Sequence, residues 1–469
     1  VWLAAVALVL ALVTSTSEAA FTGSTGVVAG VDAAGLTGQN APASGSSFSA
    51  TAIPAGCLID WSSLAGGTAV ADRYQITSEP SHAVIVTTGV GNVGAGSLSL
   101  VPSSYVSSYR LRTLAASTWI SSAAESRTAS CVRDGFVTIS AGDTATCGIS
   151  SIAQLWCWGS GYSYANGSNK AQTQAAPILV DGSSWRQVDL GQWHGCGIKS
   201  DDTLWCWGNN WIGQVGDGTT QIRNTPVMIG ATHDWVSVAA GAESTCGIRS
   251  GGTLWCWGRN DYGQLGDGSG HASSTPVAVG VGTTWRSVAA GRYDVCAIAD
   301  DGSLWCWGPN WNGELGDGTT TQRTTPTRVG SSNDWTQVAV GTSHACALAS
   351  GGSMWCWGDD SSGEGTTGVS STSPKLVAAS GFAQVRAGRA VTCGLKVDRT
   401  LWCTGSNVNG RTGLGTTTGN TVGFTQIAGS TWSSLDLGTR HGCALRTDQS
   451  LRCWGVAGAG ATGQGNTTW

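Results

Sequence analysis

The sequence predicts an all-β chain in which a seven-bladed β-propeller follows a small β-sandwich-like domain. The first observation is a repeat, because seven copies of one segment lie between Ala141 and Gly455. The first cysteines of successive copies are 49, 50, 50, 50, 47 and 50 residues apart, and such a fixed period indicates a repeat architecture. The second observation is that each copy supports four short strands, which radial repetition closes into a ring.

One copy shows how the four strands are expected. Residues 235–241 carry valine and alanine at alternating positions and predict the first strand, and residues 246–248 predict the second. The segment Ser250-Gly-Gly-Thr253 has the composition of a tight turn, and Leu254-Trp-Cys-Trp257 is the returning strand. The fourth strand is expected to begin at a proline, as in Thr225-Pro226-Val227 of the preceding copy. An aromatic residue lies six positions before a glycine in every copy: Phe136, Trp185, Trp235, Trp285, Trp335, Phe382 and Trp432.

Each copy also holds two cysteines ten positions apart. An even separation allows both to lie opposite each other across the hairpin, within disulfide reach. We therefore expect seven disulfides: Cys147–Cys157, Cys196–Cys206, Cys246–Cys256, Cys296–Cys306, Cys346–Cys356, Cys393–Cys403 and Cys443–Cys453. Structural zinc needs more closely spaced ligands, whereas reduced cysteines used as small core residues stay open as an alternative. Cys57 and Cys131 fall outside the repeats and either pair or stay separate.

The repeats resemble those of the regulator of chromosome condensation family. The resemblance rests on loops such as Gly258-Arg-Asn-Asp-Tyr-Gly-Gln-Leu-Gly-Asp-Gly268, on the Thr-Pro-Val strand and on the terminal Trp-Gly, and it covers residues 130–469. The resemblance implies a seven-bladed propeller. The founding member of the family exchanges nucleotide on the GTPase Ran. The chain departs from the family pattern at the hairpin cysteines, at Thr404 and at Arg452.

The first 130 residues predict three further segments. Residues 1–19 resemble a secretory signal peptide whose basic n-region is missing, with a signal anchor as the alternative. Residues 20–49 form an Ala/Gly/Ser-rich linker. Residues 50–128 resemble a fibronectin type III domain through Trp61, Tyr74 and the run from Leu100 to Ala115.

Ring closure poses a separate question. A proline-led strand is expected ahead of each aromatic, and none precedes Phe136. We therefore expect the native chain to continue beyond Trp469, and the ring to close imperfectly or to borrow residues 118–122.

No catalytic, cofactor or metal set is predicted. His194, His344 and His441 share one repeat position but belong to different blades, so we expect each to bond to the backbone of a neighbouring blade. Aromatic residues at non-core positions are the better candidates for binding, because exposed rings on a rigid surface are typical anchors. These candidates are Trp193, Trp211, Tyr262, Tyr293 and Trp311. The alternative is that their rings pack over the glycine-rich loops.

The sequence therefore predicts a non-enzymatic binding protein, secreted or on the extracellular face of a membrane. The number and spacing of the cysteines indicate an oxidising compartment. The net charge of −5 argues against a nucleic acid as the binding partner. The expected partner is a protein or a carbohydrate bound to a propeller face, with a membrane involved only through a signal anchor or a further C-terminal segment. A secreted enzyme with an axial-pocket active site is the alternative, and carboxylates clustered there would favour it. If the chain is intracellular, a guanine-nucleotide exchange factor is the remaining alternative.

Overall fold

The computed structural model describes residues 135–161, 165–169, 172–429, 431–456 and 460–463, together with the backbone of nine earlier strands. The chain divides into two compact units, Val1–Gly135 and Phe136–Trp469. The described residues include the 3-10 turn η1 (Val408–Gly410), and no helix among them has the length and apolarity needed to cross a bilayer.

The described strands of the first unit form two sheets. One sheet has the order β1-β2-β3-β6, and the other has the order β5-β4-β7-β8 with β9 also paired to β7. The strands are β1 (Val28–Gly30), β2 (Phe48–Ile53), β3 (Gly56–Trp61), β4 (Arg73–Glu79), β5 (Val84–Thr87), β6 (Gly96–Leu100), β7 (Val106–Ala115), β8 (Thr118–Trp119) and β9 (Arg127–Val132). The fibronectin type III resemblance and the expected relation of Cys57 to Cys131 depend on side chains that lie outside the described residues.

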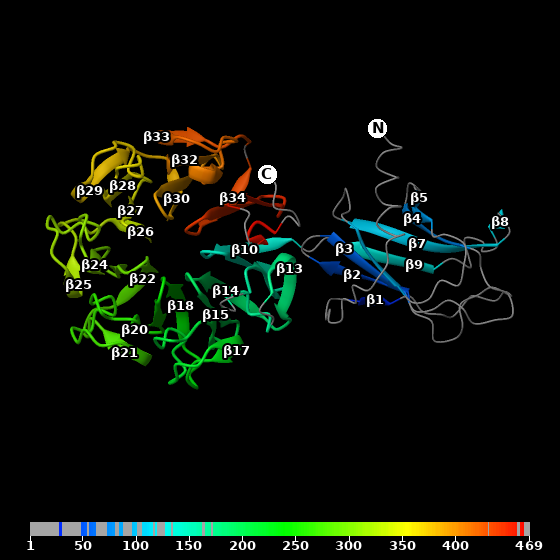
Figure 1. Cartoon of the computed structure of the whole chain (residues 1–469), viewed down its shortest axis with the longest axis horizontal. Helices are drawn as coiled ribbons and strands as arrows, with labels where there is room; N and C mark the ends of the chain where they lie inside the picture. The colour runs from blue at the N-terminus through cyan, green and yellow to red at the C-terminus, as the bar shows by residue number, and fades with distance from the viewer. Residues whose placement is uncertain are drawn as a thin grey trace. The chain divides into compact units, whose positions relative to one another are not determined.

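The second unit is the predicted seven-bladed propeller (Figure 1). Blades 1 to 6 are four-stranded antiparallel sheets, and the described strands of blade 7 number three. The first strands, in blade order, are β10 (Phe136–Ala141), β14 (Trp185–Leu190), β18 (Trp235–Ala240), β22 (Trp285–Ala290), β26 (Trp335–Val340), β30 (Phe382–Ala387) and β34 (Trp432–Leu437). The second strands are β11 (Ala145–Ser150), β15 (His194–Lys199), β19 (Ser244–Arg249), β23 (Val295–Ala299), β27 (His344–Ala349), β31 (Val391–Lys396) and β35 (His441–Arg446).

The third strands carry the Trp-Cys-Trp-Gly motif or its variants, and the fourth strands form the outer edge. The third strands are β12 (Leu155–Gly159), β16 (Leu204–Gly208), β20 (Leu254–Gly258), β24 (Leu304–Gly308), β28 (Met354–Gly358), β32 (Leu401–Ser406) and β36 (Leu451–Gly455). The fourth strands are β13 (Gln174–Asp181), β17 (Arg223–Met228), β21 (Ser273–Val279), β25 (Arg323–Arg328), β29 (Ser371–Ala378) and β33 (Asn420–Gln426).

The fourth strand differs from its prediction at the proline. Strand β17 begins at Arg223 rather than at Pro226. Its register with β16 shifts between the pairs Gly208↔Arg223 and Cys206↔Val227, so Pro226 lies at a bulge on an edge strand. Proline is tolerated there because the bulge removes the need for a ladder N–H.

All seven predicted hairpin disulfides are present. Each joins directly opposed residues, as Cys246↔Cys256 does between β19 and β20, with Cα atoms 4.1 Å apart. That separation fits a non-hydrogen-bonded antiparallel pair, in which side chains approach most closely. The other six pairs follow the same pattern.

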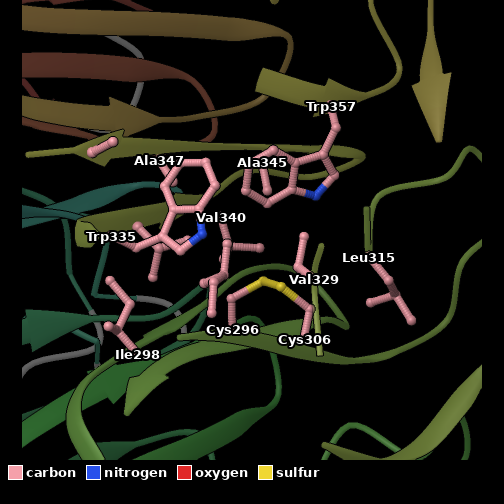
Figure 2. Close-up of a cluster of buried hydrophobic side chains, with 13 residues drawn as sticks. Cys296, Ile298, Cys306, Leu315, Val329, Trp335, Val340, Ala345, Ala347 and Trp357 are labelled. Atoms are coloured by element: carbon pink, nitrogen blue, oxygen red, sulfur yellow. A yellow bond between two sulfur atoms is a disulfide. The ribbon is translucent and has the colours of Figure 1, made fainter. Parts of the chain in front are cut away.

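The hydrophobic core lies between consecutive blades rather than within one. Figure 2 shows the disulfide Cys296–Cys306 of blade 4 facing Trp335 and Trp357 of blade 5, with all four side chains buried. The alternation of side chains along a strand explains this arrangement, since Leu304 and the cysteines face the next blade while Trp307 faces the preceding one. Each blade therefore buries its two faces against different neighbours.

Blade 7 closes the ring directly against blade 1. The backbone N–H of Ala141 donates to Asp436 Oδ2 at 2.7 Å, and the indole of Trp158 donates to the carbonyl of Ala461 at 2.9 Å. The expectation that residues 118–122 complete the ring is wrong, because Thr118 and Trp119 pair with β7 instead. The proline-led strand expected ahead of each aromatic belongs to the preceding sheet, so blade 1 begins with β10 and needs no strand before it.

Candidate binding face and axial channel

Two sets of loops lie on one end of the propeller. The first set comprises the turns between first and second strands, and the second set comprises the glycine-rich loops after each Trp-Gly. Backbone hydrogen bonds join them within a blade: Asn209 N–H donates to the carbonyl of Trp193, and Arg259 N–H donates to that of Glu243, both at 2.9 Å. We call this end the loop face. All five predicted binding aromatics belong to these two sets of loops.

Three of the predicted aromatics form one cluster. Ring centroids of Tyr262 and Trp311 are 5.1 Å apart, those of Tyr262 and Tyr293 are 5.5 Å apart, and those of Tyr293 and Trp311 are 6.4 Å apart. The three rings come from the loops of blades 3 and 4 and the turn of blade 4. Trp311 is 59% exposed and both tyrosines are half-buried. We call these three residues the aromatic cluster.

The two aromatics of blade 2 behave differently. Trp211 is 68% exposed and Trp193 is half-buried. The ring contacts found in the described part of the chain do not include either residue. The structure thus joins three of the five candidates and leaves the other two outside the cluster.

Arginines accompany the aromatic cluster, and sequence reasoning missed them. The guanidinium of Arg259 lies 5.7 Å from the ring centres of both Tyr262 and Tyr293, and that of Arg292 lies 5.0 Å from Tyr293. Arg259 also forms ion pairs with Glu243 at 2.6 Å and with Asp261 at 2.7 Å. The hydrogen bond to Glu243 raises the pKa of Arg259, so this guanidinium is charged. Its charge is balanced by the carboxylates of Glu243 and Asp261.

The first strands of the blades line an axial channel of about 680 Å³. One ring of side chains around it comes from the position two before the glycine that follows each first strand. Four polar members lie on consecutive blades 6, 7, 1 and 2, and three alanines occupy the other blades: Arg386, Asp436, Ser140, Asp189, Ala239, Ala289 and Ala339. Alignment of the repeats shows polar residues at this position in four copies, but a polar ring was not predicted from the sequence.

The two axial carboxylates are held in different environments. Asp436 pairs with Arg386 at 3.0 Å, and Asp189 accepts the backbone N–H of Ala240 at 2.8 Å and the hydroxyl of Ser140 at 3.3 Å. Burial, reinforced by the charge of Asp436, raises the pKa of Asp189 to about 7. Burial also raises the pKa of Asp436, although Arg386 opposes this. Asp189 is thus able to exchange a proton near neutral pH, while both carboxylates also bond consecutive blades together.

The channel opens on the loop face through a smaller cavity of about 160 Å³. The residue after each strand glycine projects into this mouth. Its charged members are Asp143, Arg292 and Arg389, and Arg440 follows one position later on blade 7. The mouth therefore carries more cations than anions.

The three repeat-position histidines do not form a site. His194 Nε2 lies 2.8 Å from the hydroxyl of Thr245 on the next blade, and His344 and His441 make the same contact to Thr392 and Thr146. The expected interblade bond exists, but its partner is a side-chain hydroxyl rather than backbone. Burial lowers the pKa of all three histidines to about 4. Among the described residues, no group of three or more His, Cys, Asp or Glu side chains is placed to hold a metal ion.

Comparison with known families identifies the repeat. Residues 201–248, 251–298 and 301–348 match a family model described as Regulator of chromosome condensation (RCC1) repeat, and a second RCC1 repeat model matches residues 185–210, 235–264 and 335–364. The chain therefore carries RCC1 repeats, as the sequence pattern predicted. Neither model matches the first unit, so the fibronectin type III resemblance gains no support. No curated protein sequence matches the chain.

Solved structures share the propeller. Yeast RCC1 (Prp20), solved with Kap60 bound, is 20% identical with a TM-score of 0.60, and the match covers 66% of this chain and 80% of that one. Human WBSCR16 is 18% identical with a TM-score of 0.62, over 80% and 99% of the two chains. Prp20p from Saccharomyces cerevisiae is 17% identical with a TM-score of 0.59, over 67% and 84%. At these identities the likeness shows the fold alone.

Proposed function

We propose that this protein is a non-enzymatic binding protein of an oxidising compartment, secreted or at the cell surface, whose loop face binds a protein partner. The observation that carries the proposal is the aromatic cluster, in which Trp311 stays 59% exposed beside two half-buried tyrosines. Aromatic rings held on a rigid scaffold lose little conformational entropy on binding and dominate interface energies.

The disulfides support the proposed compartment. Each blade carries one, as between Cys346 and Cys356, and both sulfurs are buried against the next blade. Such bonds persist mainly outside the cytosol. The same observation weighs against a guanine-nucleotide exchange factor, which would have to work on a cytosolic or nuclear GTPase.

Related propellers support a protein as the partner. Yeast RCC1 was solved with Kap60 bound, and the study of Prp20p describes its binding to Gsp1p and histones. These partners belong to those proteins. Their bearing on this chain is that a propeller with these repeats serves as a protein-binding platform.

The test compares the intact protein with a loop-face variant on arrays of extracellular proteins and of glycans. The variant Tyr262→Ala/Trp311→Ala is expected to lose protein signals by about tenfold or more, because each truncated anchor typically costs about 1–2 kcal/mol. Val281→Ser is the matched control, since Val281 is 90% exposed in the connection between β21 and β22. Signals that survive in the aromatic variant, or that occur on glycans only, contradict the proposal.

The axial carboxylates favour a second candidate function, an enzyme that works in the channel. A proton-exchanging Asp189 close to a second carboxylate provides groups suited to acid–base chemistry. Their bonds to Ala240 and Ala141 across blade boundaries support a structural role instead. Screening hydrolase substrates with the protein and with Asp189→Asn separates the two, since only an enzyme shows turnover that the variant loses.

A further inference from the structure

Uncompensated positive charge is concentrated at the mouth of the channel. Arg292 and Arg389 both line it and are exposed. Neither takes part in the ion pairs found among the described residues, whereas Arg259 nearby is paired to two carboxylates. The protein as a whole carries a net charge of −5, so this excess is local.

A second group of guanidiniums continues from Arg389. Arg389 and Arg440 line the same cavity. Burial lowers the pKa of Arg411, and the positive charges of Arg389 and Arg440 lower it further, so Arg411 experiences their field. Asp143 is the carboxylate that opposes them, and it pairs with Arg440 at 3.1 Å. The buried Nε of Arg411 has no hydrogen-bond partner among the described residues. A group of like charges with an unused donor is suited to an anionic ligand.

The arginines and the aromatic cluster form one continuous surface. Arg292 lines the mouth with Arg389 and Arg440, and its guanidinium also lies 5.0 Å from the ring centre of Tyr293. Tyr293 in turn contacts Trp311. A bound chain crossing this surface meets exposed rings at one end and unpaired guanidiniums at the other.

We propose that the loop face binds an acidic peptide segment of the partner, whose carboxylates pair with Arg292 and Arg389 while a neighbouring apolar side chain covers the aromatic cluster. The inference rests on the proposed function and names the chemistry of its partner. Guanidinium groups recognise carboxylates by two parallel charge-assisted hydrogen bonds. A long polyanion such as a sulfated glycan or a nucleic acid needs an extended basic track, and the few cations of this mouth do not provide one.

The test uses fluorescence anisotropy with the whole protein and two labelled peptides. One alternates glutamate and glycine around a central tryptophan, and the other has glutamine in place of every glutamate. We expect the glutamate peptide to bind at least about tenfold more tightly, and Arg292→Gln/Arg389→Gln to remove about tenfold of its affinity. Arg328→Gln/Arg399→Gln is the matched control, because both residues are exposed and neither lines the mouth. Arg328 is the last residue of β25, and Arg399 lies in the hairpin turn before β32.

Three outcomes overturn the inference: equal binding of both peptides, unchanged affinity in the Arg292/Arg389 variant, or tighter binding of heparin than of the glutamate peptide. Circular dichroism and thermal unfolding establish that each variant folds. If only the acidic-peptide inference is wrong, the arrays still show protein partners whose binding depends on Trp311 but not on Arg292 and Arg389. Failure of the proposed function removes the dependence on Trp311 as well, so the two results are distinguishable.

Discussion

The ammonium group of Lys199 lies 3.9 Å from the ring centre of Trp205 and 5.0 Å from that of Trp185. Lys199 is the last residue of β15, and the two rings come from the strands on either side of it. A cation between two aromatic faces is attracted by the quadrupole of both rings. This side chain therefore joins all three inner strands of blade 2.

The same repeat position varies in a regular way. Arg249 lies 4.5 and 4.6 Å from two rings in blade 3, and Lys396 occupies the equivalent place in blade 6. In blade 4 the residue is Ala299, and Trp285 and Trp305 contact each other edge-on with centroids 6.3 Å apart. The blades thus stabilise the same region by a cation between the rings or by direct ring contact.

Replacing Lys199 by methionine removes the charge and keeps most of the apolar stem. We expect the free energy of unfolding to fall by about 0.5–2 kcal/mol, since the Lys199 side chain is only 15% exposed and its ammonium also pairs with Asp181 at 2.9 Å. Urea unfolding measures the change, and Asp181→Asn combined with Lys199→Met separates the ion pair from the ring contact. Lys375→Met, at an exposed position, is the control. Equal stability of both methionine variants contradicts the expectation.

Local patterns predicted much of the propeller. The hairpin of Cys246 and Cys256 and the opposite faces of Cys256 and Trp257 follow from the two-residue period of a strand. The Lys199 arrangement was not predicted because it needs three strands in register, although a cation three residues after the first cysteine was a visible signal in four copies.

The candidate site was predicted less completely than the fold. Tyr262 and Trp311 were recognised as loop aromatics, but their contact joins different blades, and sequence spacing does not give such distances. Asp189 and Asp436 are 247 positions apart, and their charges interact only because the ring closes. The role of Ala461 as acceptor for Trp158 was missed for the same reason.

Each hairpin disulfide is expected to stabilise the propeller. Replacing both Cys296 and Cys306 by alanine is expected to lower the free energy of unfolding by about 2–4 kcal/mol, because the bond restricts the unfolded chain and its sulfurs fill the interblade core. Guanidinium unfolding of the variant and the intact protein measures the difference. Mass spectrometry after alkylation of the natively purified protein checks the pairing. Labelling of the fourteen repeat cysteines before reduction contradicts the disulfides and the proposed compartment.

The buried histidines predict a loss of stability in mild acid. Thr245 donates its single hydroxyl proton to the carbonyl of Gln214 at 2.8 Å, so it accepts from His194 Nε2. Burial of the ring, whose Nδ1 has no hydrogen-bond partner among the described residues, favours the neutral imidazole. The folded pKa is about 4, whereas the unfolded side chain takes up a proton below its ordinary pKa of 6.5. The stabilising contribution is thus complete above pH 6.5 and is lost as the pH falls toward 4.

His194→Gln retains an N–H donor for Thr245 but cannot titrate. We expect the free energy of unfolding of the intact protein to fall more steeply than that of the variant between pH 6.5 and 4, by about 1.4 kcal/mol per pH unit. Asp189 acts in the opposite sense over part of this range, because its raised pKa favours the protonated folded form, but it is common to both proteins. His271→Gln, at an exposed position, is the control. Parallel profiles for the intact protein and His194→Gln contradict the expectation.

Thr404 replaces the second tryptophan of the repeat motif in blade 6, yet it keeps the interblade bond that tryptophan makes elsewhere. In blade 5 the indole of Trp357 donates to the carbonyl of Glu314 in the preceding blade at 2.8 Å. The hydroxyl of Thr404 donates to the carbonyl of Gly363 in the preceding blade at 2.6 Å. A much smaller side chain therefore makes the same kind of bond to the loop of the preceding blade.

Thr404→Val conserves the shape of this fully buried side chain and leaves the Gly363 carbonyl without its donor. We expect the free energy of unfolding to fall by about 1–3 kcal/mol, the usual cost of an unsatisfied buried polar group. Thr404→Ser keeps the hydroxyl and is expected to lose less, and Thr417→Val tests the same change at an exposed position. Hydrogen exchange of residues 360–367 gives a second measurement, because the lost bond is expected to loosen that loop specifically. A valine variant as stable as the serine variant would mean that blade 6 is held by apolar packing alone.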